Sequence, residues 1–277
     1  MNRKAYFAVL LAASLAGLSG LFIKHMSIGP TSMAWIRTTL PTLFMGSIFL
    51  VQRRNIFRRG YKKLLLASVL NVGRMFFFFY AFVHTTIGNA TLILFTWPAF
   101  VVVMSALFLK EKINGKQVML LAMAMIGIAI VYAQDLTFSG SDFLGMSAAL
   151  AAALFYSITV IIFKSDADNF EPGEMIFFQN VVGSLVFFPF FIINHPLPTS
   201  LDWAIASGHA LFLGTFAFFL FFYGLKRMNA SRAAMIAYVE IVVALTVGVL
   251  VMHEPLTLHM IVGGMIIVLS TYLLRRS

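Results

Sequence analysis

Apolar stretches of about 20 residues follow one another along almost the whole chain, which is the length an α-helix needs to cross a bilayer. Hydrophobic residues make up 61% of the 277 residues and charged residues only 11%. The mean hydropathy of +0.93 is far above that of soluble domains, which are about half apolar. The sequence therefore predicts an all-α membrane protein.

Polar residues and Gly/Pro breaks divide the chain into ten predicted transmembrane helices. Their limits lie near 5–24, 31–52, 62–84, 87–110, 115–133, 142–164, 173–193, 201–224, 230–252 and 256–274. The first run follows Arg3 and Lys4 as a signal peptide would, but it is long and no Ala-x-Ala cleavage site precedes Thr31. We expect a retained first helix.

The distribution of Lys and Arg predicts the orientation of these helices. If the N-terminus is placed inside, all but three of the 20 basic residues fall at the inner ends of the helices or in the inner loops. The outer loops contain only Lys24, beside Asp135, Asp142, Asp202 and Glu254. The positive-inside rule then places both termini in the cytoplasm, as expected for a multi-pass protein of a bacterial inner membrane. The net charge of +10 is accordingly attributed to basic loops that set the topology and contact anionic lipid headgroups. We expect no nucleic-acid partner.

Two segments of the chain resemble each other. Asn-Ala-Thr at 89–91 opens a run that ends near Glu111, and Asn-Ala-Ser at 229–231 opens a run that ends near Glu254. The two glutamates follow the fourth and the ninth predicted helix. We therefore predict two five-helix repeats, 1–136 and 137–277, which are inverted relative to each other because five is odd. Inverted repeats are a recurrent transporter architecture.

Several motifs resemble the drug/metabolite transporter superfamily, specifically its EamA-type members with ten helices. The resemblance covers nearly the whole chain and is carried by six motifs. They are the Gly-rich end of the first helix with its lysine (17–24), the arginine of the second helix (Arg37), Thr-x-Pro in the fourth (96–98), the Leu-Lys-Glu-Lys-Ile junction (109–113), the opening of the sixth helix (140–145) and Tyr-x-Glu in the ninth (238–240). The family's proline after the last motif is replaced by Ile241, so the sequence does not itself predict a kink in the ninth helix.

The resemblance implies secondary transport of small metabolites, often outward, by alternating access around a central cavity. That cavity would be bounded by helices one to four and six to nine. The fifth and tenth helices would be peripheral, which leaves both a monomer and a homodimer open.

Three charged residues lie deep within predicted helices, where each ionised side chain costs about 2.5–3.5 kcal/mol and needs a partner or a wet cavity. They are Arg37, Arg74 and Glu240. Arg74 is the preferred anion-binding residue. Glu240 could serve as a counter-charge, as a ligand for a substrate ammonium group or as a proton carrier. The alternative is that the three charges only neutralise one another.

Four uncharged side chains complete the predicted substrate site: Tyr80, Trp97, Gln179 and Tyr238. Trp97 precedes Pro98, which frees the carbonyl four residues back and bends the helix. His84, Asn180 and His209 could add polar contacts, although inter-helix hydrogen bonding would recruit the same residues.

The predicted function is export of amino acids or related amphoteric compounds. The alternatives are import or exchange of nucleotide-like or cationic metabolites and, as a less favoured alternative, an intramembrane enzyme. An enzyme is not favoured, because there is no cysteine and the His253-Glu254 pair with His259 does not match the His-Glu-x-x-His zinc motif. We expect no catalytic residue, metal or cofactor. The expected partners are a small-molecule substrate and membrane lipid.

Overall fold

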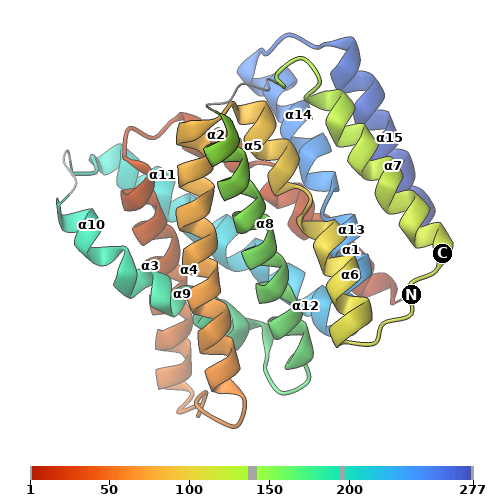
Figure 1. Cartoon of the computed structure of the whole chain (residues 1–277). Coiled ribbons are helices and arrows are strands. Elements are labelled where there is room, and N and C mark those ends of the chain that lie inside the picture. The colour runs from red at the N-terminus through yellow and green to blue at the C-terminus, as the bar shows by residue number, and fades with distance from the viewer. Residues whose placement is uncertain (1, 137–141, 194–196, 276–277) are drawn as a thin grey trace.

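The computed structural model describes residues 2–136, 142–193 and 197–275, and these residues form a bundle of helices (Figure 1). The helices are α1 (Arg3–Ala16), α2 (Ser19–Lys24), α3 (Pro30–Val51), α4 (Tyr61–His84), α5 (Ile87–Leu94), α6 (Trp97–Phe108), α7 (Gly115–Val131), α8 (Asp142–Ser165), α9 (Pro172–Val186), α10 (Phe188–Ile193), α11 (Ser200–Leu211), the π-helix η1 (Phe212–Ala217), α12 (Phe218–Arg227), α13 (Ala230–Ile236), α14 (Val239–Met252) and α15 (Leu258–Arg275). Each of the ten predicted runs is helical, which confirms the all-α fold.

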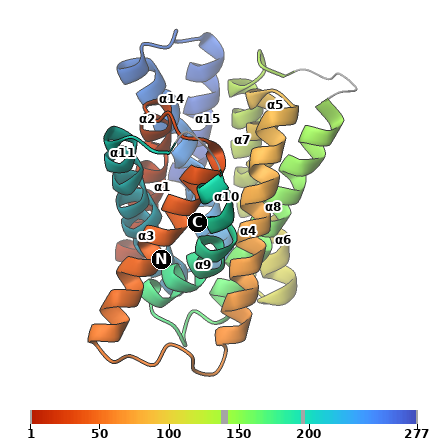
Figure 2. The ribbon, with the colours of Figure 1, turned by 90° about the vertical axis from the view of Figure 1, so that its left-hand side faces the viewer.

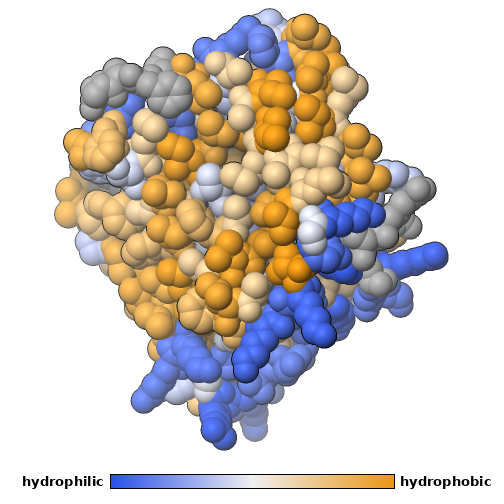
Figure 3. Space-filling view, turned by 45° about the vertical axis from the view of Figure 1, so that its right-hand side comes forward, coloured by the Kyte–Doolittle hydropathy of each residue, from blue (hydrophilic) through white to orange (hydrophobic). Residues whose placement is uncertain are grey.

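The lengths and composition of the helices fit a membrane. Seven helical segments of the described chain are long and apolar enough to span one, and 115–131 and 258–274 form shorter apolar helices. Large apolar side chains are exposed around the bundle, including Leu50, Val51 and Val83 at 81%, 86% and 75%. Figure 3 shows this apolar surface over the middle of the molecule, with hydrophilic residues gathered at the lower end and at the top. Exposed apolar surface on this scale is expected where lipid is the solvent.

Several predicted helices are interrupted. α1 and α2 are separated at Gly17–Leu18, α5 and α6 at Phe95–Thr96, and α13 and α14 at Ala237–Tyr238. α9 gives way to α10 at Phe187, and η1 lies between α11 and α12. The break before Trp97 agrees with the bend predicted from Pro98, whose ring nitrogen cannot bond the carbonyl of Leu94. The break at Ala237–Tyr238 occurs without proline, so the ninth helix is interrupted where its sequence gave no signal.

Pairs of helices pack along their lengths. α4 packs against α8 and α9, α3 against α9, α1 against α12, and α7 against α15, the last pair lying together at the right of Figure 1. α7 and α15 meet closely at two glycines, since a Cβ added to Gly127 would lie 2.9 Å from the carbonyl oxygen of Gly263. Small residues allow this backbone approach.

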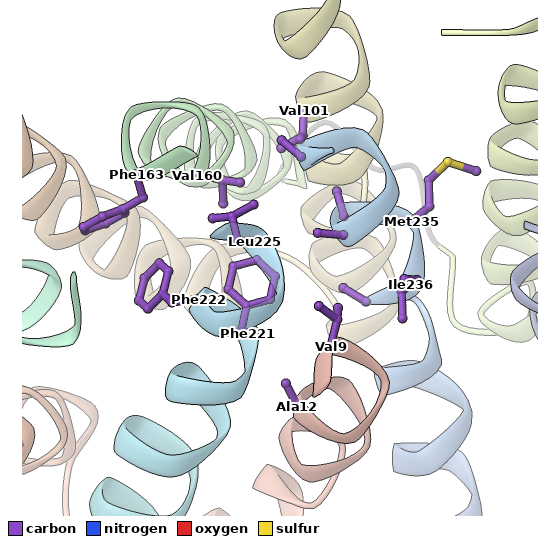
Figure 4. Close-up of a cluster of buried hydrophobic side chains, with 14 of the residues drawn as sticks. Val9, Ala12, Val101, Val160, Phe163, Phe221, Phe222, Leu225, Met235 and Ile236 are labelled. Atoms are coloured by element: carbon purple, nitrogen blue, oxygen red, sulfur yellow. The ribbon is translucent and has the colours of Figure 1, made fainter. Parts of the chain in front are cut away.

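The largest buried cluster joins helices that are distant in sequence. Val9 of α1, Val101 of α6, Phe163 of α8, Phe222 of α12 and Met235 of α13 converge there (Figure 4). The cluster fixes the positions of the interrupted helices, α5–α6 and α13–α14, relative to α1, α8 and α12. Those helices carry Trp97, Tyr156 and Glu240.

The two ends of the bundle differ in charge. We call one end of the bundle the basic end; it carries the loops at 52–60, 109–114, 165–171 and 227–229. The opposite end carries the loops at 25–29, 85–86 and 253–257. Figure 2 shows the bundle from the side. At the basic end Glu174 receives bonds from Arg54 at 2.9 Å and Arg58 at 2.7 Å. At the opposite end the backbone N–H and hydroxyl of Ser27 each bond Asp202 at 2.8 Å. Each end is therefore tied across the two halves of the chain.

Candidate functional site

Arg74 projects from the middle of α4 and is held by neighbours on three helices. Its Nε donates to Oδ1 of Asn71 at 3.0 Å, and Nδ2 of Asn71 donates to the carbonyl oxygen of Gln179 on α9 at 3.0 Å. The guanidinium carbon lies 5.0 Å from the centroid of the Tyr156 ring on α8, within cation–π range. One nitrogen of the guanidinium is thereby fixed. In the described chain, its two terminal nitrogens make no protein hydrogen bond.

Arg37 lies on α3 and is half-buried. Its backbone faces the π-helix η1, because a Cβ added to Gly214 would lie 3.5 Å from the carbonyl oxygen of Arg37. π-Helical turns are frequent at functional sites. Among the residues that the structure describes, the Arg37 guanidinium has no hydrogen bond and no ion pair.

Glu240 lies in the first turn of α14, directly after the break at Ala237–Tyr238. It interacts electrostatically with both Arg37 and Arg74. Within the described ranges, however, no Lys or Arg nitrogen approaches its carboxylate within 4 Å, since the ion pairs of that part of the chain join other residues. We call Arg37, Arg74 and Glu240 the central charged cluster.

The geometry of the central charged cluster bears on the alternative that its charges only neutralise one another. A structural ion pair in a membrane would be expected to close to direct contact, because the low dielectric strengthens its attraction. Among the described residues, no direct ion pair joins these three groups. Such an arrangement leaves hydrogen-bonding capacity for a polar molecule placed between the groups.

Trp97 and Tyr156 support the cluster from one side. Their rings meet edge to face with centroids 4.7 Å apart, and the hydroxyl of Ser157 donates to the carbonyl oxygen of Trp97 at 2.9 Å. Trp97 is buried, at 5% exposure. It therefore packs against Tyr156, the residue that contacts Arg74.

Gln179 lies on α9 next to Asn71 and is buried. Its backbone oxygen accepts the bond from Asn71, while its own side-chain oxygen has no hydrogen-bond partner in the described structure. A buried amide oxygen without a partner is costly. It is thus a buried acceptor without a partner on α9, the helix whose backbone Asn71 bonds.

Tyr238 and Tyr80 take different positions from the other predicted site residues. Tyr238 is fully buried, and its hydroxyl donates to the carbonyl oxygen of Phe95 at 3.2 Å, so it ties the break in α13–α14 to the break in α5–α6. Tyr80 is 38% exposed and stacks on His84 with ring centroids 3.9 Å apart. The structure does not bring Tyr80 to the central charged cluster.

Two further residues join the surroundings of the cluster. Tyr156 was not among the predicted site residues, because nothing in its helix distinguishes this aromatic side chain from those that face lipid. His209 of α11 interacts electrostatically with Arg37, and its Nε2 lies 3.0 Å from the Ser19 hydroxyl. Its Nδ1 has no partner within the described residues. The polar surroundings thus extend from α4 and α9 to α2 and α11.

Comparison with known proteins places the chain among transporters. The sequence pattern of the EamA-like transporter family matches residues 3–133 and again 143–276. An "Uncharacterized transporter" of Archaeoglobus fulgidus is 27% identical and covers 94% of this chain and 92% of its own. The "Pseudopaline exporter CntI" of Pseudomonas aeruginosa is 25% identical, over 98% of this chain and 95% of its own.

A solved structure supports the fold. A protein of known crystal structure superposes with a TM-score of 0.88 over 99% of both chains at 17% sequence identity. Identity at that level indicates a shared fold and carries no argument about substrate.

Proposed function

The chain belongs to the EamA-like transporter family, and we propose that it exports small amphoteric metabolites, amino acids or related compounds, by alternating access. The protein is a multi-pass membrane transporter of small molecules, as its family and relatives indicate. The observation that carries the finer proposal is the central charged cluster, in which two arginines and one glutamate are half-buried within the helices and, among the described residues, form no direct ion pair.

The cluster suits a molecule that carries charges of both signs. The free nitrogens of Arg74 and Arg37 match a carboxylate or phosphate, since a guanidinium forms two parallel bonds to such a group. Glu240 matches an ammonium group, and the orphaned oxygen of Gln179 accepts one more hydrogen bond. A substrate bound between these groups would satisfy charges that are otherwise expensive at this depth.

The balance of charge argues against the alternative of a purely cationic metabolite. Two positive groups face one negative group, so a monovalent cation would meet net repulsion in a medium of low dielectric. A nucleotide-like anion would bind the arginines, but its negative charge would repel the carboxylate of Glu240. Export is supported by the resemblance of the chain to the pseudopaline exporter.

The repeat architecture and orientation also belong to this proposal. Two inverted five-helix repeats, 1–136 and 137–277, are supported by the double match of the family pattern and by the similar breaks in α5–α6 and α13–α14. Inverted repeats place the site at their interface near the middle of the bilayer. The basic end would face the cytoplasm of a bacterial inner membrane.

Purified protein and two site variants test the proposal. A thermal-shift screen of amino acids, acidic amino compounds, nucleotides and cationic amines identifies a ligand, because a compound that binds only the folded state raises its apparent stability. That ligand is then used for counterflow in proteoliposomes. Arg74→Ala and Glu240→Gln are expected to lower counterflow by about 10- to 100-fold, the effect of removing one charged hydrogen-bond partner.

Matched variants at the basic end control for loss of charge alone. Arg227→Ala and Asp168→Asn remove one charge of each sign from exposed positions and should leave counterflow within about twofold of the unmodified protein. Unchanged counterflow in both Arg74→Ala and Glu240→Gln, at equal protein levels, would refute the site. Stabilisation by simple cations alone would favour the cationic alternative.

A further inference from the structure

Three tyrosines lie near Glu240, and they differ in what their hydroxyl groups bond. Tyr238, two residues before it, donates to the carbonyl oxygen of Phe95 at 3.2 Å. Tyr132, which follows α7, interacts electrostatically with Glu240 and is joined by a hydrogen bond to a threonine side chain of α5. Tyr156 also interacts with Glu240, but in the described chain its hydroxyl makes no hydrogen bond to protein. One of the three hydroxyl groups is therefore unused.

The Tyr156 side chain belongs to the inward face of α8. Residues four positions apart share one face of a helix, and the neighbours of Tyr156 at that spacing, Ala152 and Val160, are 0% and 2% exposed. α8 packs along its length against α4, the helix that carries Arg74. Tyr156 thus faces the interior of the bundle and not the lipid.

Close packing holds the Tyr156 ring beside Arg74. Gly73 of α4 lies against α8, since a Cβ added there would lie 2.7 Å from Cε1 of Phe155. This approach occurs one residue before both Arg74 and Tyr156, and it leaves the guanidinium carbon 5.0 Å from the centroid of the ring. Trp97 meets the same ring edge to face, with centroids 4.7 Å apart. The ring is therefore held by two neighbours, while its hydroxyl keeps its hydrogen-bonding capacity.

The Tyr156 hydroxyl lies among the three charges of the central charged cluster. Tyr156 interacts electrostatically with Arg74, Glu240 and Arg37. Its oxygen is not fully enclosed by protein in the described structure, unlike the side-chain oxygen of Gln179. It therefore borders space that a substrate or water can fill.

The bonds that Arg74 already makes determine which group can be bound beside this hydroxyl. Nε of Arg74 donates to Asn71, so its two terminal nitrogens remain for an anion, and such a pair forms two parallel bonds to a carboxylate. A carboxylate has about four lone-pair sites and can accept a third bond from a phenol O–H. A carboxamide presents an NH₂ group in place of one oxygen and cannot accept both parallel bonds.

We propose that Tyr156 is a substrate-binding residue whose hydroxyl donates to the carboxylate that Arg74 binds. It thereby makes the site prefer a carboxylate to an uncharged group of the same shape. This inference rests on the proposed amphoteric substrate and adds a specificity-determining residue on α8.

Thiol labelling tests whether position 156 lines the site, and it needs no substrate. The chain has no cysteine, so Tyr156→Cys carries a single thiol. Ser157→Cys is the matched control on the next residue, because Ser157 is fully buried and its hydroxyl donates to the carbonyl oxygen of Trp97 at 2.9 Å. Two methanethiosulfonate reagents, one with a sulfonate and one with a trimethylammonium group, are applied to the full-length protein in nanodiscs.

Tyr156→Cys should react with both reagents, and about tenfold faster with the sulfonate, because two arginines and one glutamate give the site a net positive charge. Ser157→Cys should react far more slowly with either reagent, since its position is enclosed. Labelling of Tyr156→Cys as slow as that of Ser157→Cys, or faster with the trimethylammonium reagent, would overturn the proposal.

Tyr156→Phe isolates the hydroxyl, because the ring that packs against Arg74 and Trp97 is kept. Affinities of the standard amino acids and their carboxamides are measured from concentration-dependent thermal shifts. An amino acid that binds the unmodified protein should lose about tenfold in affinity, the effect of one hydrogen bond to a charged group, and its carboxamide only about two- to threefold.

Tyr223→Phe is the matched control for this substitution. Tyr223 lies at the basic end, and its ring also packs against an arginine, with the guanidinium carbon of Arg227 at 3.7 Å from the ring centroid. Loss of this hydroxyl should change neither affinity. An equal loss for the amino acid and its carboxamide in Tyr156→Phe, or no loss at all, would contradict the assignment.

Failure of the proposed function would give a different result. If no amino acid stabilises the unmodified protein while the sulfonate reagent still prefers Tyr156→Cys, the amphoteric substrate is refuted and the anion-binding role of position 156 stands.

Discussion

Charged side chains at the basic end contribute unequally to the stability of the fold. Glu174 is fully buried and accepts bonds from Arg54, from both terminal nitrogens of Arg58 and from the backbone N–H of Glu171. Arg58 also stacks over Phe170 at 4.6 Å. Glu171 itself is 51% exposed, and within the described ranges its one ion pair is with Lys226. A buried carboxylate with several charged donors contributes far more than an exposed ion pair.

Glu174→Gln should therefore lower the stability of the protein. The change leaves two guanidinium groups without a counter-charge, and because these are about one-third exposed, solvent reduces the cost to about 1–3 kcal/mol. The matched change Glu171→Gln should cost about 0–1 kcal/mol. Thermal unfolding in detergent, monitored by size-exclusion chromatography, measures the midpoints of both variants. Equal midpoints for the two variants would contradict this assignment.

The pH dependence of this ion pair follows from the hydrogen bond to Glu174, which raises the pKa of Arg58 above its ordinary range. A group whose pKa is raised on folding stabilises the fold below its unfolded pKa and loses that effect as pH rises through the folded value. The Arg58 contribution should consequently be constant between about pH 6 and 9.

At the scale of helices, the breaks position the charged groups. Glu240 lies in the first turn of α14 because the chain is interrupted at Ala237–Tyr238. Gly17, at the break between α1 and α2, lies against this turn, and a Cβ there would be 2.6 Å from the carbonyl oxygen of Glu240 and 2.7 Å from Cβ of Val243. The close approach of α1 to α14 thus requires glycine.

Gly17→Ala should reduce transport although it removes no polar group. The added methyl would push the first turn of α14 away from α1 and displace Glu240, and misplacement of a binding group by about 1 Å can cost about 100-fold. Gly20→Ala is the matched control, because its Cβ would meet only Cε of Met252 at 3.7 Å. Counterflow at equal protein levels compares them. Equal activity of the two variants would show that the approach at Gly17 does not position Glu240.

At the scale of the molecule, the two ends of the bundle are built from different contacts. The basic end combines the Glu174 cluster with a 2.6 Å bond from the backbone N–H of Ala230 to Glu111, whereas the opposite end uses Ser27–Asp202 and a 3.1 Å bond from Thr85 to Asp142. The proposed orientation places the first of these in the cytoplasm, as expected for basic loops beside anionic headgroups.

Single cysteines at the two ends test that orientation. Gln52→Cys lies in an exposed position of the basic end and Leu256→Cys in the loop between α14 and α15, where Leu256 is 58% exposed. In spheroplasts of an expressing bacterium, an impermeant maleimide should label only Leu256→Cys, and permeabilisation should expose Gln52→Cys. The reverse pattern would invert the proposed topology.

The sequence by itself determined the helical class, the ten apolar runs and the depth of Arg37, Arg74 and Glu240. These properties depend on local composition, since about 20 apolar residues are needed for one span whatever lies beside it. The bend before Trp97 was likewise local, because proline lacks the N–H that a helix requires. The two-repeat division and the site assignment remain predictions.

Only the tertiary structure decided which faces of the helices meet. Lipid and neighbouring helices are equally apolar, so a membrane helix shows little in its sequence of which side is buried in protein. That is why Tyr156 was missed beside Arg74, why Tyr80 lies apart from the cluster, and why the break at Ala237–Tyr238 had no signal. The partner of Glu111 also lies in the other half of the chain, a contact that only packing can bring together.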